Sequence, residues 1–262
     1  MFYFTDIHGN IELFYYVVDW CKRQNPSCTI IFGGDAADRG EYGYQIIKEM
    51  LADPQIIYLF GNHEQLFLQA ANELITIASQ NKILFGALHR ITTLEQVNQW
   101  LATYHGNAVN NYIYNGGFPT LRDWLFDGAN ANILRELERL PRTYSYKNID
   151  FCHAGGTYNA FLDWQHTERV ILWDRDCLNM EWADGRICVH GHTPVQAIKR
   201  NYIRPLATRF DNNSWRINMD CGTAFSNMIY VLNCNTMEIT GFLLCENGIL
   251  ERDSYVIGGL QR

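Results

Sequence analysis

The stretch TIIFGGDAADRG, residues 29–40, is the key to interpreting the rest of this chain. Its apolar half has the length of a strand and breaks into two glycines, which predicts a buried strand ending in a tight turn. Asp35, Asp38 and Arg39 follow directly, at the carboxyl end of the predicted strand, where open α/β sheets place their chemistry. Two acceptor carboxylates beside an obligate cation suit a metal ion and an anion held side by side. Taken alone, the stretch is also compatible with a polar turn and a salt bridge, which is the weaker of the two interpretations.

A strand end near the N-terminus carries residues of the same kind. Residues 1–5 (MFYFT) predict a short strand that runs directly into Asp6 and His8. Alternation in an extended chain would place both side chains on one side, within reach of one ion. A lone Asp-x-His is weak evidence, because a solvated turn has the same composition.

A third strand end favours the metal interpretation. Residues 56–60 (IIYLF) predict a strand that leads into Asn62 and His63. Apolar residues at helical spacing over 13–21 and 46–51 separate the three strands, which predicts a parallel sheet with right-handed crossovers. Side chains at neighbouring strand ends then converge on one site. Carboxylate, imidazole and amide ligands together suit Mn²⁺, Fe²⁺ or Zn²⁺.

The second half of the chain repeats this pattern twice. Residues 148–152 lead into His153, and residues 187–189 lead into His190 and His192, either of which could face the site. We expect the strands predicted later in the chain to form an antiparallel meander in a second sheet against the first. These strands cover residues 215–220, 228–233 and 238–245.

Residues 65–147 are predicted to form a helix-rich insertion that caps the site and shapes access to it. Helices are expected over residues 66–79, 94–104 and 133–140. His89 and His105 lie in this insertion, and we interpret both as surface or packing histidines. No stretch resembles a linker, so we expect a single domain over residues 1–262.

Composition argues against several classes of protein. Of the 262 residues, 47% are apolar, so a sizeable core is available. A net charge of −7 without a basic cluster makes nucleic acid an unexpected partner. Cys152 and Cys188 lie in strand-like runs and no Cys-x-x-Cys pair occurs, which favours reduced, buried thiols. No leader is visible and no apolar run approaches membrane length, so we expect a cytoplasmic protein without a membrane partner.

Five motifs, taken in order, resemble the signature of calcineurin-like metallophosphoesterases, and more narrowly the bacterial and phage-lambda-type branch of the phosphoprotein phosphatase family. The motifs are Asp6-x-His8, Gly34-Asp35-x-x-Asp38-Arg39-Gly40, Gly61-Asn62-His63-Glu64, His153-Ala154-Gly155 and Gly191-His192-Thr193-Pro194. Asn115-Gly116-Gly117, residues 170–175 and residues 218–222 extend the similarity over most of the chain. The resemblance implies a mixed α/β fold of two facing mixed β-sheets flanked by helices, a four-layer sandwich with a helical cap insertion.

The resemblance also implies a binuclear centre of two divalent metal ions, with Mn²⁺ as the expected metal and Fe or Zn as alternatives. The implied metal ligands are Asp6, His8, Asp35, Asn62, His153 and His192. Asp6 and His8 would hold the first ion, and Asp35 would bridge the two. The Gly-His-Thr-Pro match favours His192 over His190 as the ligand. A metal-bridging hydroxide would attack phosphorus directly.

The resemblance implies further roles for residues that are not ligands. Arg39 and Arg175 would bind the phosphate oxygens. His63, oriented by Asp38, would protonate the departing alkoxide. The assignment of Arg175 is open, since two other arginines flank the same region. These are Arg169 and Arg186.

Three functions are compatible with these residues. The leading expectation is a metal-dependent phosphomonoester hydrolase of the serine/threonine protein phosphatase type, acting on a phosphoprotein or a small phosphoester. A symmetrical dinucleoside tetraphosphate hydrolase is the alternative, but such relatives tend to lack the aspartate at Asp38 and to carry Asp where Glu64 stands. An inactive metal-binding interaction module is disfavoured, because every implied ligand is present. The sequence predicts neither the physiological substrate nor the oligomeric state.

Overall fold

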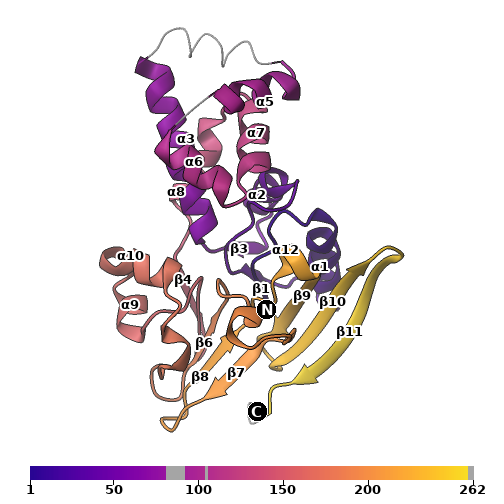
Figure 1. Ribbon diagram of the computed structural model, residues 1–262. Coiled ribbons are helices and arrows are strands. Elements are labelled where there is room, and N and C mark those ends of the chain that lie inside the picture. Colours follow the sequence, from indigo (N-terminus) through magenta and orange to yellow (C-terminus); the bar gives the residue numbers. More distant parts are fainter. Residues whose placement is uncertain (81–91, 104–105, 259–262) are drawn as a thin grey trace.

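Two mixed β-sheets face each other in the computed structural model, which describes residues 1–80, 92–103 and 106–258 (Figure 1). The first sheet has the strand order β11-β10-β9-β1-β2-β3, and the second has the order β4-β5-β6-β8-β7. The strands of the first sheet are β1 (Phe2–Phe4), β2 (Ile30–Phe32), β3 (Ile56–Tyr58), β9 (Met228–Asn233), β10 (Glu238–Cys245) and β11 (Gly248–Val256). Those of the second are β4 (Thr143–Tyr146), β5 (Ile149–Cys152), β6 (Ile187–His190), β7 (Leu206–Arg209) and β8 (Trp215–Asn218). The predicted fold class, two facing mixed sheets flanked by helices, is confirmed.

Strands β1, β2 and β3 are parallel, as the alternation of strands and helices predicts. Helices α1 (Ile11–Gln24) and α2 (Gly43–Ala52) connect them. The register places Phe4 opposite Phe32, and Phe32 opposite Tyr58. The three strands therefore end side by side, and the loops that follow them start from neighbouring points.

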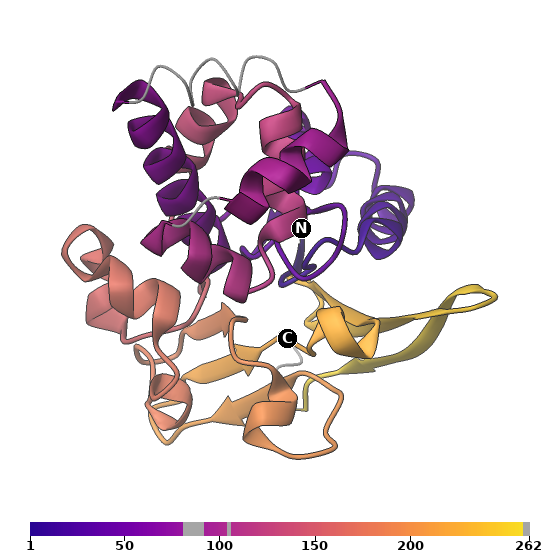
Figure 2. The same ribbon diagram turned by 45° about the horizontal axis from the view of Figure 1, so that its top comes forward.

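The predicted meander belongs to a different sheet from the one expected. Strands β9, β10 and β11 are antiparallel, but β9 pairs with β1 and so extends the first sheet. Strand β8 pairs with β6 in parallel and with β7 in antiparallel orientation, in the second sheet. The prediction that the C-terminal strands form a second sheet by themselves was wrong. The pattern of apolar residues does not indicate which existing strand has a free edge for them to pair with. The hairpin of β10 and β11 extends away from the rest of the fold (Figure 2).

Strand alternation divides the apolar residues between two cores. Tyr3 and Ile31 lie in a cluster between the two sheets, together with Phe151 and Ile217 of the second sheet. Their neighbours along the strands, such as Phe32, lie in the larger cluster beneath the helices. Both faces of β1 and β2 are thus buried, which explains why these two strands are apolar throughout.

The segment between β3 and β4 is helical, as predicted, and its helices gather at one end of the molecule (Figure 1). They are α3 (Asn62–Gln80), α5 (Leu94–Thr103), α6 (Asn107–Tyr114), α7 (Phe118–Phe126) and α8 (Ala131–Glu138). Helix α3 starts at Asn62, four residues earlier than predicted, which places Asn62 and His63 in its first turn. The interpretations of His89 and His105 concern positions outside the described residues. The single-domain assignment stays a prediction.

Short helices complete the fold after β5. They are α9 (Tyr158–Leu162), α10 (Trp164–Trp173), the 3₁₀ turn η1 (Cys177–Asn179), α11 (Val195–Ile198) and α12 (Thr223–Ser226). All eight cysteines are free, and Cys152 and Cys188 are buried in β5 and β6, as predicted. Within the described part of the chain, no helix has the length and apolar character needed to cross a membrane.

Candidate metal centre

The loops that follow β1, β2, β3, β5 and β6 meet at one edge of the facing sheets. The N–H of Asp6 donates to Gly34 O over 3.0 Å, and the N–H of Gly191 donates to His153 O over 2.8 Å. Gly34 has a φ of 98°, and a Cβ atom there would lie 2.8 Å from Gly61 Cα. Only glycine permits both this backbone conformation and this approach. The candidate residues therefore come together from five separate parts of the chain.

Asp35, His153 and His192 form one cluster, with ligand atoms within 4.8 Å of one another. Asn62 Oδ1 lies 2.8 Å from His153 Nε2 and 2.8 Å from His192 Nδ1. His153 Nδ1 lies 2.9 Å from Gly33 O. Because a carbonyl oxygen only accepts, Nδ1 carries the hydrogen and Nε2 faces the cluster. The four residues that the resemblance implies for the second ion are thus adjacent.

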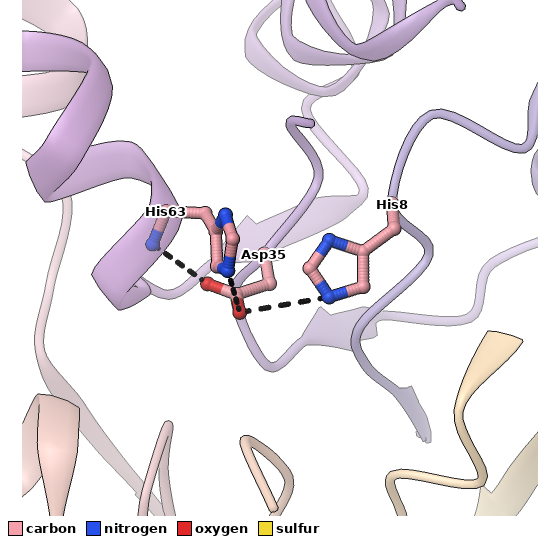
Figure 3. Close-up of side chains that lie close together, drawn as sticks. All are labelled: His8, Asp35 and His63. Carbon is pink, nitrogen blue, oxygen red and sulfur yellow. Dashed lines mark hydrogen bonds and ion pairs between the residues drawn. The ribbon is translucent and has the colours of Figure 1, made fainter. Parts of the chain in front are cut away.

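His8, Asp35 and His63 form a second cluster (Figure 3). Asp35 Oδ2 lies 3.8 Å from His8 Nε2 and 3.9 Å from His63 Nε2. His8 Nδ1 lies 3.0 Å from Ala37 O, which again places the hydrogen on Nδ1 and leaves Nε2 facing Asp35. Asp35 belongs to both clusters, as a bridging carboxylate must. The sequence predicts His63 only as a proton donor, whereas its position also suits a ligand.

Asp6 does not lie where strand alternation predicts. Strand β1 ends at Phe4, and both Asp6 (φ 55°) and His8 (φ 45°) have left-handed backbone, so alternation along an extended strand was the wrong reason for pairing them. Asp6 Oδ2 accepts a hydrogen bond from Thr5 Oγ1 over 2.6 Å and from the N–H of His192 over 3.2 Å. Asp6 belongs to neither cluster found among the described residues. It lines the site from the side of His192.

Left-handed backbone is concentrated at this site. The candidate residues with positive φ are Asp6, His8, Asp35, Asp38, Arg39 and His192. Such conformations cost roughly 1–3 kcal/mol each and persist only where the surroundings hold them. Glu64, which is fully buried, does this for the loop after β2: it accepts the N–H groups of Asp35 over 2.8 Å and of Ala36 over 2.9 Å. Sequence reasoning assigned Glu64 no role, although its carboxylate within the third motif was the available signal.

His63 and Asp38 form a buried pair beside the clusters. His63 Nδ1 donates to Asp38 Oδ2 over 2.6 Å, and Asp38 is fully buried. Burial lowers the pKa of His63, but the charges of Asp35 and Asp38 outweigh this and raise it above its usual value. The pair therefore fixes the orientation of the ring, with Nδ1 bonded to Asp38 and Nε2 facing the cluster.

Arg39 lies between two of the histidines. Its Nη1 lies 2.9 Å from His8 Nε2, and its Nη2 lies 3.2 Å from His63 Nε2. The N–H of Arg39 donates to Gly116 O over 2.9 Å. Gly116 has a φ of 93°, and a Cβ atom there would lie 3.0 Å from Arg39 N, so glycine allows the contact. This contact explains why an Asn-Gly-Gly motif in the helical segment accompanies the metal motifs.

The three candidate arginines of the later segment differ in their surroundings. Arg175 Nη1 donates to Thr193 Oγ1 over 3.4 Å, beside His192. Arg186 forms an ion pair with Asp150 instead, on the second sheet. Arg169 is exposed. Of the three, Arg175 is the one whose hydrogen bond places it beside the site.

The donor set fits divalent cations. Burial raises the pKa of Asp35, but His153 and His63 outweigh it and hold this pKa well below the usual value. Burial lowers the pKa of His153, yet Asp35 raises it to about 10. A cluster that retains a proton so strongly attracts positive charge, and a metal ion would replace that proton. His192 Nε2 is buried without a hydrogen-bond partner, so the site also contains a free polar atom.

Comparison with known proteins agrees with this geometry. The sequence profile of the calcineurin-like phosphoesterase family matches residues 2–211. The chain belongs to this family of metal-dependent phosphoester hydrolases. A search of curated proteins found no match.

Solved structures are similar to this chain at low sequence identity. A putative diadenosine tetraphosphatase is 15% identical, with a TM-score of 0.50, and the match covers 98% of this chain and 94% of that one. A metallophosphoesterase from Sphaerobacter thermophilus is 14% identical, with a TM-score of 0.47 and coverage of 97% and 90%. A protein serine/threonine phosphatase from Saccharomyces cerevisiae is 13% identical, with a TM-score of 0.40 and coverage of 98% and 79%. At this identity the likeness concerns the fold alone.

Proposed function

We propose that this metallophosphoesterase is a serine/threonine protein phosphatase. The observation that supports the proposal is the buried pair of His63 and Asp38, joined over 2.6 Å next to the candidate metal ligands. An imidazole held at this place can act as a general acid towards a leaving group when it is protonated.

A general acid matters most when the leaving group is a strong base. Serine and threonine leave as alkoxides, which must be protonated as the P–O bond breaks. A nucleotide leaving from a dinucleoside polyphosphate is already a stable anion and gains little from a proton. The pair formed by Asp38 and His63 therefore supports an alcohol phosphate as substrate, and dinucleoside tetraphosphate hydrolysis is the alternative.

The ligand assignment is part of the proposal. Asp35 would bridge two divalent ions, Asp6 and His8 would complete the first site, and the second would have the remaining ligands. These are Asn62, His153 and His192. The nitrogen and oxygen donors, without a thiolate, suit Mn²⁺. When bound, the metals would bring the pKa of water near neutrality and provide a nucleophile.

The chain's own residues would bind and orient the substrate. Arg39, exposed between His8 and His63, would bind the phosphate oxygens, and Arg175 would do so from the side of His192. His63 would then donate its Nε2 proton to the departing oxygen, and Asp38 would hold the ring in position.

A substrate comparison tests the proposal. Metal-reconstituted protein is assayed on a panel of serine and threonine phosphopeptides and on dinucleoside tetraphosphates. We expect kcat/KM to be higher for the phosphopeptides, and Asp38→Asn to lower it for them far more than for the dinucleotides. Preference for the dinucleotides, with an equal effect of Asp38→Asn on both substrate classes, would favour the alternative.

A further inference from the structure

The outer face of the second sheet contains a buried charge that the candidate metal centre does not use. Trp215 and Ile217 lie in the core between the sheets, so alternation along β8 places Arg216 on the opposite face. Cross-strand register brings His190 of β6 opposite Asn218, on the same face. Arg216 is 2% exposed and His190 is 1% exposed. Charged side chains are rarely buried to this extent without a partner of opposite charge.

No carboxylate pairs with Arg216 within the part of the chain that the structure describes. Two of its nitrogens donate to backbone carbonyl oxygens, and Nη1 has only Cys188 Sγ, at 3.9 Å. Asp150 lies on β5, two strands away from β8, with Cys188 of β6 between it and Arg216 in the register. Asp150 is already engaged by Arg186. The guanidinium also lies over the ring of Trp182, 5.0 Å from its centroid, but has no counter-anion among the described residues.

A cavity of about 60 Å³ has Arg216 on its lining. Arg216, His190 and Asn218 form its buried part, and the exposed residues Asn179 and Thr208 lie on its lining as well. A water molecule needs about 10–15 Å³ of such volume, so the cavity has room for a few waters or one tetrahedral ion.

His190 contributes an acceptor to the same cavity. Its Nδ1 lies 3.2 Å from Gly191 O, which only accepts, so Nδ1 carries the hydrogen. Nε2 of the neutral ring then carries a lone pair, and this atom is buried without a hydrogen-bond partner. The cavity lining thus combines a cation without a counter-anion, which donates, with an imidazole nitrogen without a partner, which accepts.

We propose that this cavity binds one inorganic phosphate ion, separate from any phosphate at the metal centre. Charged phosphate oxygens would accept hydrogen bonds from Arg216, and a P–OH group would donate to His190 Nε2. Phosphate carries at least one P–OH group at neutral pH, whereas sulfate carries none. The site therefore distinguishes two ions of the same shape, because sulfate leaves the His190 lone pair facing an oxygen lone pair.

Calorimetric titration of the metal-loaded protein with phosphate and with sulfate tests the proposal. We expect two phosphate sites per chain, of which Arg39→Ala weakens only the one at the metal centre. Thr208→Trp fills the mouth of the cavity and should abolish the other. Thr236→Trp, on the exposed turn between β9 and β10, is the matched control and should change neither. At the site sensitive to Thr208→Trp, sulfate should bind about tenfold more weakly, as the loss of one buried hydrogen bond implies.

His190→Phe provides a second measurement that does not depend on the Trp substitution. It removes the acceptor and keeps the size of the ring, so phosphate should bind the cavity no better than sulfate does. A single phosphate site that Thr208→Trp leaves unchanged would show that the cavity holds water only and would overturn the proposal. Equal affinity of the unmodified cavity for the two ions would overturn it too. Neither outcome depends on whether the protein dephosphorylates proteins.

Discussion

Replacing His63 with alanine tests the role of the buried pair that supports the proposed function. Asp38 is fully buried, and the bond of 2.6 Å to His63 fixes which ring nitrogen faces the substrate. General acid catalysis contributes ~10²–10⁴-fold to a rate. This factor corresponds to about 2.7–5.4 kcal/mol of activation free energy, at 1.36 kcal/mol for each factor of ten. We expect kcat on a serine phosphopeptide to fall by this factor.

The leaving group separates acid catalysis from other effects. On p-nitrophenyl phosphate, whose leaving group needs no proton, we expect His63→Ala to lower kcat by less than about tenfold. Asp38→Asn should likewise lower kcat on both substrates. His166 is a matched control, because it forms a similar bond of 2.7 Å with Asp163 but is exposed. His166→Ala should leave both rates unchanged.

The metal content of the variant decides between two roles for His63. Because its Nε2 lies 3.9 Å from Asp35 Oδ2, in a cluster with His8, His63 is also placed to be a ligand. Elemental analysis of dialysed protein should find the same metal content in His63→Ala as in the unmodified chain. Loss of an ion, together with an equal fall in rate on both substrates, would refute the assignment of His63 as the acid.

Three further outcomes are expected. Arg175→Ala should lower kcat/KM by about ten- to a hundredfold through loss of a phosphate contact, whereas Arg169→Ala should leave kcat/KM unchanged. Equal effects of the two substitutions would leave the second phosphate-binding arginine unassigned. Chelation should abolish hydrolysis of an aryl phosphate and Mn²⁺ should restore most of it, while full turnover by demetallated protein would contradict a metal-dependent site. Lys22 Nζ lies 2.6 Å from Asp53 Oδ2; burial raises the pKa of Asp53, but the bond to Lys22 outweighs it and lowers this pKa below its usual value. Asp53 then contributes to stability above the pKa that it has in the unfolded chain, and this contribution is lost as pH falls through the lower pKa of the folded state. Asp53→Asn should therefore lower Tm at pH 7, by an amount that disappears in acid. A change in Tm that does not depend on pH would contradict the ionic origin.

The sequence alone determines the parallel core of this protein and the identity of its candidate site. Apolar runs that end in Asp, His and Asn predict strands with functional side chains at their carboxyl ends. The point at which such a strand ends depends on neighbouring residues in the chain, so it can be predicted from the sequence. The order of the motifs is sufficient to imply the family. Gly34, directly before Asp35, is required by a positive φ and by a close approach to the backbone of Gly61.

Only the tertiary structure decides how the parts are grouped. The C-terminal meander pairs with β1 instead of forming the second sheet, because strand alternation specifies faces but not edges. His63 lies in a cluster with His8, and Asp6 lies in neither cluster, because left-handed backbone redirects both N-terminal side chains after β1 ends. The burial of Arg216 without a counter-anion among the described residues has no signature in the sequence, since an arginine within a strand reveals nothing about which acids lie within reach. Distances between residues far apart in the chain are set by packing, and the function of these residues depends on those distances.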